Sequence, residues 1–88
     1  MNKKDKKIIK KLTEEEKYSK ILQFLKNIVI KNPSDQELLF NLALYTSLLG
    51  YLKNINKYKN EAKKLYKKVI FLNKNYYLAS LAKARLEE

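Results

Sequence analysis

The 88 residues contain one glycine and one proline, the two amino acids that most strongly favour turns. Sandwiches and barrels reverse direction often and need such residues at many of their turns. Long helices need few turns, and a hydrophobic content of 45% is sufficient to bury a core between them. The scarcity of glycine and proline therefore predicts an all-α fold, and the length limits it to a single domain.

Side chains suited to catalysis or metal binding are scarce. The sequence has no cysteine and no histidine, so it lacks thiolate nucleophiles, the usual transition-metal ligands and the commonest general base near neutral pH. With Gly50 as its one glycine, it cannot form a glycine-rich phosphate loop. Glu14, Glu15 and Glu16 are adjacent and the other acidic residues are scattered, which indicates no converging pair of carboxylates. We therefore expect a protein that is not an enzyme and that has no cofactor or metal ion.

The formal net charge is +11, which is typical of proteins that bind nucleic acid. Only Arg85 among the 20 basic residues is an arginine, although the arginine fork is the preferred group for bases and phosphates. The abundance of Asn, Ile and Tyr also fits a bias toward AT-rich codons, which favours lysine. A basic helical nucleic-acid-binding protein is the alternative to a protein-binding scaffold, and the sequence leaves open whether the charge is functional.

No apolar run approaches the roughly 18 residues that a transmembrane helix needs. The amino terminus is basic, as in a signal peptide, but Ile8 and Ile9 are followed at once by further lysines. The apolar region of a signal is therefore missing, and we expect a soluble, cytoplasmic protein.

Residues 1–12 are rich in lysine, with Ile8, Ile9 and Leu12 as a small apolar cluster. They fit either a short capping helix or a frayed basic tail. Repulsion among the lysines favours the tail. The helical domain is expected to cover residues 13–88.

Apolar side chains recur at helical spacing after Glu16. Thr13 and Glu16 form a capping-box pattern, which predicts the start of a helix. Asn32 precedes Pro33, and the residue before a proline is pushed out of the α region. The first helix of the domain is therefore predicted from Thr13 to Asn32.

The second predicted helix follows Pro33 and is apolar on nearly every side. Ser34 and Glu37 repeat the capping-box pattern at its start. Gly50 offers one end, but apolar residues continue as far as Ile55, so the helix can run past the glycine. A helix that is apolar all round is either central in a helical stack or covered by a partner.

Two further helices complete the prediction. The third begins near Tyr58 or Asn60 and ends near Asn73. The fourth follows a turn in which Asn75 is the expected cap, and its apolar residues reach Leu86.

The first and third predicted helices repeat each other with a period of 41 residues (62 minus 21). The corresponding residues are Ile21 and Ala62, Leu25 and Tyr66, Ile28 and Val69, and Asn32 and Asn73. Small side chains at such positions let helix backbones approach, while large side chains fill the space between layers. The period therefore predicts stacked helices with interlocking side chains.

Four segments carry a recognisable pattern of small and large residues. They are Ile21-x3-Leu25-x2-Ile28 followed by Pro33, Leu39-x2-Leu42-Ala43-x2-Thr46, Ala62-x3-Tyr66-x2-Val69, and Leu78-x2-Leu81-Ala82. The first and third resemble the second helix of a tetratricopeptide repeat, and the other two resemble its first helix. The resemblance covers residues 14–88, as half a repeat, one full repeat and half of another. It implies antiparallel helical hairpins stacked as a short solenoid.

The sequence also departs from this family. Its period of 41 residues exceeds the family's period of about 34. The surplus lies between Gly50 and Tyr58, where about two extra turns keep the same helix face inward. Lys74 stands where the family has a proline.

By resemblance, the first helices of the repeats line a concave groove that holds an extended peptide or a partner helix. The residues expected to line it are Glu37, Phe40, Asn41, Leu44, Ser47 and Leu48. Phe40 and Leu44 would contact apolar side chains of the partner, and Asn41 would hydrogen-bond its backbone. Alternatively, Phe40 and Leu44 are buried by the flanking helices or by a folded-back amino terminus. No carboxylate clamp is expected, because the positions around Leu78 and Ser80 are not basic.

Lys63, Lys64, Lys67 and Lys68 are predicted to form a basic ridge on the exposed side of the third helix. One interpretation is a solvated face without a partner. The other is an electrostatic docking site for an acidic protein or an anionic lipid surface, whose contribution would fall with rising salt.

Fewer than three full repeats rarely form a stable unit alone, because the open ends leave apolar surface exposed. We therefore expect either homo-oligomers or a partner that covers an open end, and sedimentation velocity measures the first of these. A monomer that melts cooperatively well above about 60 °C, near the top of the mesophilic range, would contradict this expectation.

Overall fold

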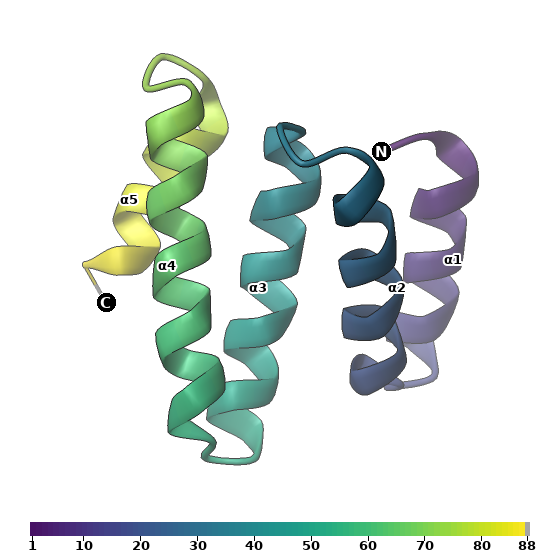
Figure 1. Cartoon of the computed structure of the whole chain (residues 1–88). Coiled ribbons are helices and arrows are strands. Elements are labelled where there is room, and N and C mark those ends of the chain that lie inside the picture. The colour runs from purple at the N-terminus through teal and green to yellow at the C-terminus, as the bar shows by residue number, and fades with distance from the viewer. Residues whose placement is uncertain (88) are drawn as a thin grey trace.

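The computed structural model describes residues 1–87, and this part of the chain contains five helices and no strand (Figure 1). The helices are α1 (Lys3–Glu14), α2 (Tyr18–Lys31), α3 (Gln36–Leu52), α4 (Asn56–Leu72) and α5 (Tyr77–Leu86). Consecutive helices run in opposite directions, with α3 between α2 and α4 (Figure 1). The predicted all-α class is confirmed. None of the helices described is long and apolar enough to cross a lipid bilayer.

The lysine-rich amino terminus forms a helix, α1, in place of the frayed tail favoured above. The side chain of Asn2 caps it by accepting a hydrogen bond from the amide of Asp5 at 2.8 Å. Asp5 lies in the first turn and Lys11 in the last, which is the favourable order for the helix dipole. Ile9 is buried in the same core cluster as residues of α2 and α3. Capping and burial together offset the repulsion among the lysines.

The predicted helix start at Thr13 is wrong, because Thr13 lies in the last turn of α1. The chain leaves α1 through Glu16, whose φ of 56° is in the left-handed region. The amide of Lys17 then donates to the carbonyl of Leu12 at 2.8 Å, and the amide of Glu16 donates to the carbonyl of Thr13. These two bonds form a Schellman motif, which usually has glycine at the left-handed position.

The Lys17 side chain lies 3.0 Å from Glu15 and lowers the pKa of that carboxyl by hydrogen bonding and by its charge.

The start of α3 differs by one residue from the prediction. Asp35, and not Ser34, caps the helix by accepting a hydrogen bond from the amide of Leu38 at 3.1 Å. At its other end α3 continues past Gly50 to Leu52, as the apolar pattern allowed.

The connection between α3 and α4 is shorter than predicted. Asn54 has a φ of 53°, and the amide of Ile55 donates to the carbonyl of Gly50 at 2.8 Å in a second Schellman closure. The turn needs only residues 53–55, so α4 begins at Asn56 and not near Tyr58. Tetratricopeptide repeats have a period of about 34 residues. The residues by which this sequence exceeds that period lengthen α3 and α4, which have 17 residues each.

The last connection also differs in detail. Tyr76 is the N-cap residue of α5, without a side-chain capping bond. The side chain of Asn73 holds the turn by accepting a hydrogen bond from the amide of Asn75 at 3.0 Å. The amide of Asn75 therefore closes the turn, and Asn75 is not the helix cap that the sequence predicted.

The core consists of two clusters, and each of them includes side chains of α3. The first contains Ile9, Ile21, Leu22, Leu25, Leu38, Leu42 and Leu49. The second contains Leu39, Ala43, Ala62, Tyr66, Val69, Leu78 and Ala82. α3 contributes residues to both, so it is apolar over a wide arc. The radius of gyration of 12.4 Å matches the value of about 12 Å expected for a compact chain of this length.

Small residues sit where helices come closest. Ala43, Ala62 and Ala82 are all buried in the second cluster, as the interlocking pattern predicted. Gly50 is buried where α3 meets the start of α4. A β-carbon at this position would lie 3.0 Å from the backbone nitrogen of Lys59, which is closer than side chains normally pack. Gly50 therefore allows the close approach of α3 and α4.

We expect Gly50→Ala to lower the free energy of unfolding by about 1 kcal/mol in urea titration. Alanine favours the helix by about 1 kcal/mol, but overpacking against backbone costs about 1–3 kcal/mol. Asn60→Ala, at an exposed position of α4, is the control and should gain about 0.5 kcal/mol. If Gly50→Ala were as stabilising as the control, the two helices would not approach this closely.

Candidate partner-binding groove

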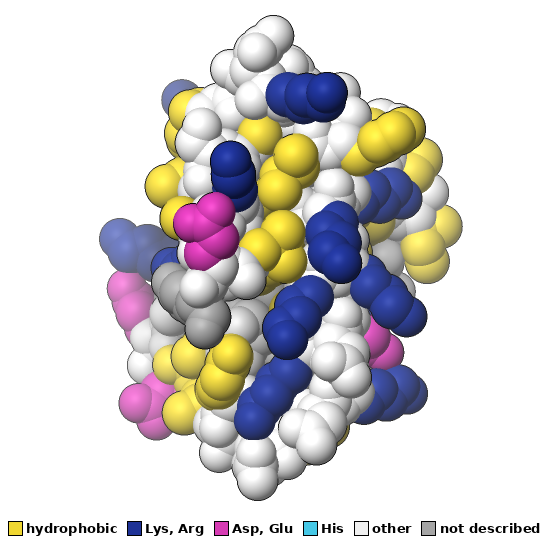
Figure 2. All heavy atoms as spheres, turned by 90° about the vertical axis from the view of Figure 1, so that its left-hand side faces the viewer, with side chains coloured by type: hydrophobic (Ala, Val, Ile, Leu, Met, Phe, Trp, Pro, Cys, Tyr) yellow, Lys and Arg dark blue, Asp and Glu magenta, His cyan; other side chains and the backbone are white. Residues whose placement is uncertain are grey.

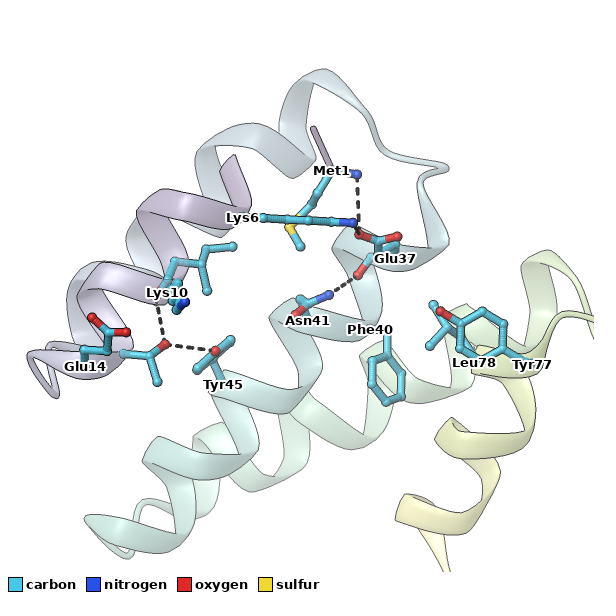
Figure 3. Close-up of a pocket in the computed structure, with 12 residues that line it drawn as sticks. Met1, Lys6, Lys10, Glu14, Glu37, Phe40, Asn41, Tyr45, Tyr77 and Leu78 are labelled. Atoms are coloured by element: carbon cyan, nitrogen blue, oxygen red, sulfur yellow. Dashed lines mark hydrogen bonds and ion pairs between the residues drawn. The ribbon is translucent and has the colours of Figure 1, made fainter. Parts of the chain in front are cut away.

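A groove of about 580 Å³ lies where side chains of α1, α3 and α5 face one another (Figure 3). Its volume falls within the range of small binding sites in proteins. The lining residues are Met1, Lys6, Ile9, Lys10, Thr13, Glu14, Glu37, Phe40, Asn41, Tyr45, Tyr77 and Leu78. No residue of α2 or α4 is among them, so the groove belongs to the alternate helices.

The apolar wall of the groove lies between α3 and α5. Phe40 and Leu78 lie close together there, with Tyr77 beside them (Figure 3). Phe40 is half-buried and packs edge-on against Tyr66 of α4, with ring centroids 5.7 Å apart. One side of Phe40 therefore joins the core, and another side lines the groove.

Tyr77 forms the exposed rim of this wall. Its side chain is 61% exposed, and its ring lies 4.8 Å from the ring of Tyr76, centroid to centroid. Partial burial, together with the adjacent Tyr77, raises the pKa of Tyr76 above its ordinary value. The Tyr76 ring therefore stays neutral at physiological pH, and together with the Tyr77 ring it forms an aromatic rim that can contact apolar groups.

Ion pairs join the beginning of α1 to the beginning of α3. The side chain of Lys6 lies 3.5 Å from the carboxylate of Glu37, and the amino group of Met1 lies 3.8 Å from it. The same amino group lies 3.5 Å from Asp35. Asn41 donates from its side-chain amide to the backbone carbonyl of Glu37 at 2.8 Å. The carbonyl oxygen of the Asn41 side chain has no hydrogen bond within residues 1–87, so it can accept one from a ligand.

A hydroxyl pair joins the end of α1 to the middle of α3. Thr13 donates its one hydroxyl hydrogen to the backbone carbonyl of Ile9 at 2.7 Å. The Tyr45 hydroxyl lies 3.1 Å from the same Thr13 oxygen and must therefore be the donor of that bond. Contacts at both ends of α1 thus hold it as one wall of the groove (Figure 3).

The structure brings three of the six predicted groove residues, Glu37, Phe40 and Asn41, into the groove. The other three, Leu44, Ser47 and Leu48, are half-buried on α3 but do not line it. α1 ends at Glu14, near Tyr45, so its wall does not extend along the second half of α3. The α1 residues, Met1, Tyr45, Tyr77 and Leu78 were missed. For α1 the only signal was the apolar cluster around Ile9, for which a tail was favoured over a short capping helix.

The predicted basic ridge lies on a different part of the molecule. Lys63, Lys64, Lys67 and Lys68 are all exposed on α4, and none of them forms an ion pair with another described residue. Figure 2 shows a file of basic side chains beside a band of hydrophobic ones on the face formed by α4 and α5. The ridge and the groove are therefore two separate surfaces.

Within residues 1–87, no three acidic side chains gather closely enough to hold a metal ion. The chain matches no protein-family model, no curated protein and no solved structure at a significant level.

We expect Tyr45→Phe to loosen α1, because the variant loses the bond to Thr13, which is worth about 1 kcal/mol. Trypsin should then cut after Lys10 and Lys11 about fivefold faster, since cleavage follows the population of the open form. Tyr18→Phe is the control, because the Tyr18 hydroxyl makes no such bond to α1 among the described contacts. Equal cleavage rates in the two variants would show that the hydroxyl pair does not hold α1.

Proposed function

We propose that this protein is a non-enzymatic scaffold that binds a peptide or a partner helix in the groove between α1, α3 and α5. The observation that carries the proposal is the lining of this groove by three alternate helices, with an apolar wall and unused polar groups. Phe40, Tyr77 and Leu78 form the wall, and the side-chain oxygen of Asn41 lies near its edge. Such sites are mostly apolar, with a few polar groups that orient the ligand.

The resemblance to tetratricopeptide repeats supports the same proposal. In such a solenoid the first helix of each repeat lines the concave surface, and the second helix lies behind it. We propose that α1, α3 and α5 are the first helices and that α2 and α4 are the second ones. The buried positions of Ala43 and Ala62 fit this assignment, because the family has small residues at the corresponding contacts.

The chemistry of the groove indicates the kind of segment that fits it. Apolar side chains of the partner would pack between Phe40 and Tyr77, while a backbone amide donates to Asn41. On the opposite wall Lys10 is exposed and forms no ion pair with another described residue. An acidic residue of the partner next to its apolar side chains would therefore complement Lys10. We propose a short amphipathic segment with apolar and acidic residues as the ligand.

A matched pair of tyrosines provides the test. Tyr77, 61% exposed, lines the groove, whereas Tyr51, 63% exposed, lies near the end of α3 and does not. Peptides selected from a random library against this protein should carry apolar and acidic residues. We expect Tyr77→Asp to weaken their binding at least about tenfold, because a charge replaces an aromatic ring that contacts the apolar residues of the peptide. Tyr51→Asp should leave the binding unchanged.

Isothermal titration calorimetry measures the affinities, and circular dichroism confirms that both variants stay folded. Peptides that bind both variants as tightly as the parent would place the binding site outside the groove. A library that yields no binding peptide would contradict the proposed function.

A further inference from the structure

Phe71 is the most exposed large hydrophobic residue among those described, at 85%. It lies in the last turn of α4, whose buried residues are Ala62, Tyr66 and Val69. With 3.6 residues per turn, position 71 lies about 170° around the helix from the mean direction of those three. The side chain therefore points directly away from the core, at the centre of the solvent-exposed face of α4.

Lysines surround this side chain along the helix. Lys67 and Lys68 lie about one turn before Phe71, Lys64 lies two turns before it, and all three are exposed. The only acidic residue of α4, Glu61, is half-buried and lies nearly three turns away. The exposed face of α4 thus combines an apolar side chain with positive charges that no described carboxylate neutralises.

The end of α2 repeats the combination. Ile30 is 78% exposed and lies 41 residues before Phe71 (71 minus 30), which is the period of the internal repeat. Lys26 and Lys31 are exposed beside it, and α2 contains no acidic residue. α2 and α4 run in the same direction and end on the same side of the molecule (Figure 1). Two apolar side chains with basic neighbours are therefore carried by the ends of two similarly oriented helices.

We propose that this face of α2 and α4 binds an anionic phospholipid surface. Phe71 and Ile30 would enter the boundary between headgroups and acyl chains, while Lys26, Lys67 and Lys68 contact the phosphates. Peripheral membrane proteins use this pairing, because one apolar anchor binds weakly by itself and basic residues supply the second contribution. We call the set Ile30, Phe71, Lys26, Lys67 and Lys68 the lysine–phenylalanine face.

Two other polyanions fit the observations less well. Nucleic acid would stack its bases on planar side chains, and of the two apolar residues of this face only Phe71 is planar. The described basic side chains of this face are all lysines, which lack the arginine fork. An acidic protein would need to supply a pocket for Phe71, because this residue protrudes from α4 and is 85% exposed. A fluid lipid layer accepts a protruding side chain without such a pocket.

The lysine–phenylalanine face and the groove lie on different helices, so one protein can bind both ligands at once. α1 and α5, which bear groove residues, lie behind α2 and α4 in the view of Figure 1. The inference is therefore independent of the proposed function. The groove variant Tyr77→Asp should bind vesicles as the parent protein does.

Sedimentation with vesicles tests the inference, using phosphatidylcholine with or without about one third phosphatidylserine, at about 0.15 M salt. We expect binding only to the anionic vesicles. Phe71→Ser should weaken it about tenfold through lost apolar burial. The double variant Lys67→Gln, Lys68→Gln should weaken it about 25-fold, at about fivefold for each lysine. The control Lys3→Gln, Lys4→Gln removes the same charge from α1 and should weaken binding less than about threefold.

Tryptophan fluorescence gives a second readout that does not depend on affinity. The chain has no tryptophan, so Phe71→Trp introduces a single reporter at the expected point of insertion. Its emission should shift to the blue on anionic vesicles and be quenched by lipids with brominated acyl chains. Tyr51→Trp, at the end of α3, is the control and should show neither change.

Three results would overturn the inference. The first is no sedimentation with anionic vesicles, and the second is equal sedimentation of Phe71→Ser and the parent protein. The third is tighter binding to random RNA than to the vesicles at the same salt, with the RNA affinity lost in the double lysine variant but kept in Phe71→Ser. That last pattern would assign the lysines to nucleic acid.

Discussion

The burial of α3 on both sides is the constraint on which the rest of the structure depends. Leu38 and Leu42 pack toward α1 and α2, whereas Leu39 and Ala43 pack toward α4 and α5. The pairs α1–α2 and α4–α5 both depend on α3 for part of their core, because each cluster contains residues of α3. A chain of 88 residues has little apolar surface to spare, so sharing one helix between two clusters is an economical way to build a domain.

The placement of charge follows from the central position of α3. Glu37 is its only charged residue, and that carboxylate lies at the edge where Lys6 reaches it. The lysines are carried by the outer helices, where water or a ligand can reach them. The apolar groove and the lysine–phenylalanine face therefore use different helices for different chemistry. The groove depends on α1, which is held mainly by a few polar contacts and by Ile9.

Features set by neighbours along the helix could be predicted from the sequence, and features set by distant contacts could not. The all-round apolar α3 and the buried small residues follow from local spacing, whereas the groove positions of Phe40 and Asn41 were expected from the resemblance to tetratricopeptide repeats. The end of α1 does not, because a left-handed Glu16 has no local signal and the Thr13–Tyr45 pair joins residues 32 apart. Tyr77 was missed because all the groove residues were expected on the second predicted helix.

Native-state hydrogen exchange at increasing denaturant measures most directly whether α3 joins the two clusters into one unit. We expect the slowest amides of α2, α3 and α4 to converge on one free energy of opening, because unfolding either side exposes α3. Two separate values, with α2 opening while α3 and α4 stay protected at much higher free energy, would contradict a shared central helix. They would also remove the support for a groove that needs α1, α3 and α5 in place together.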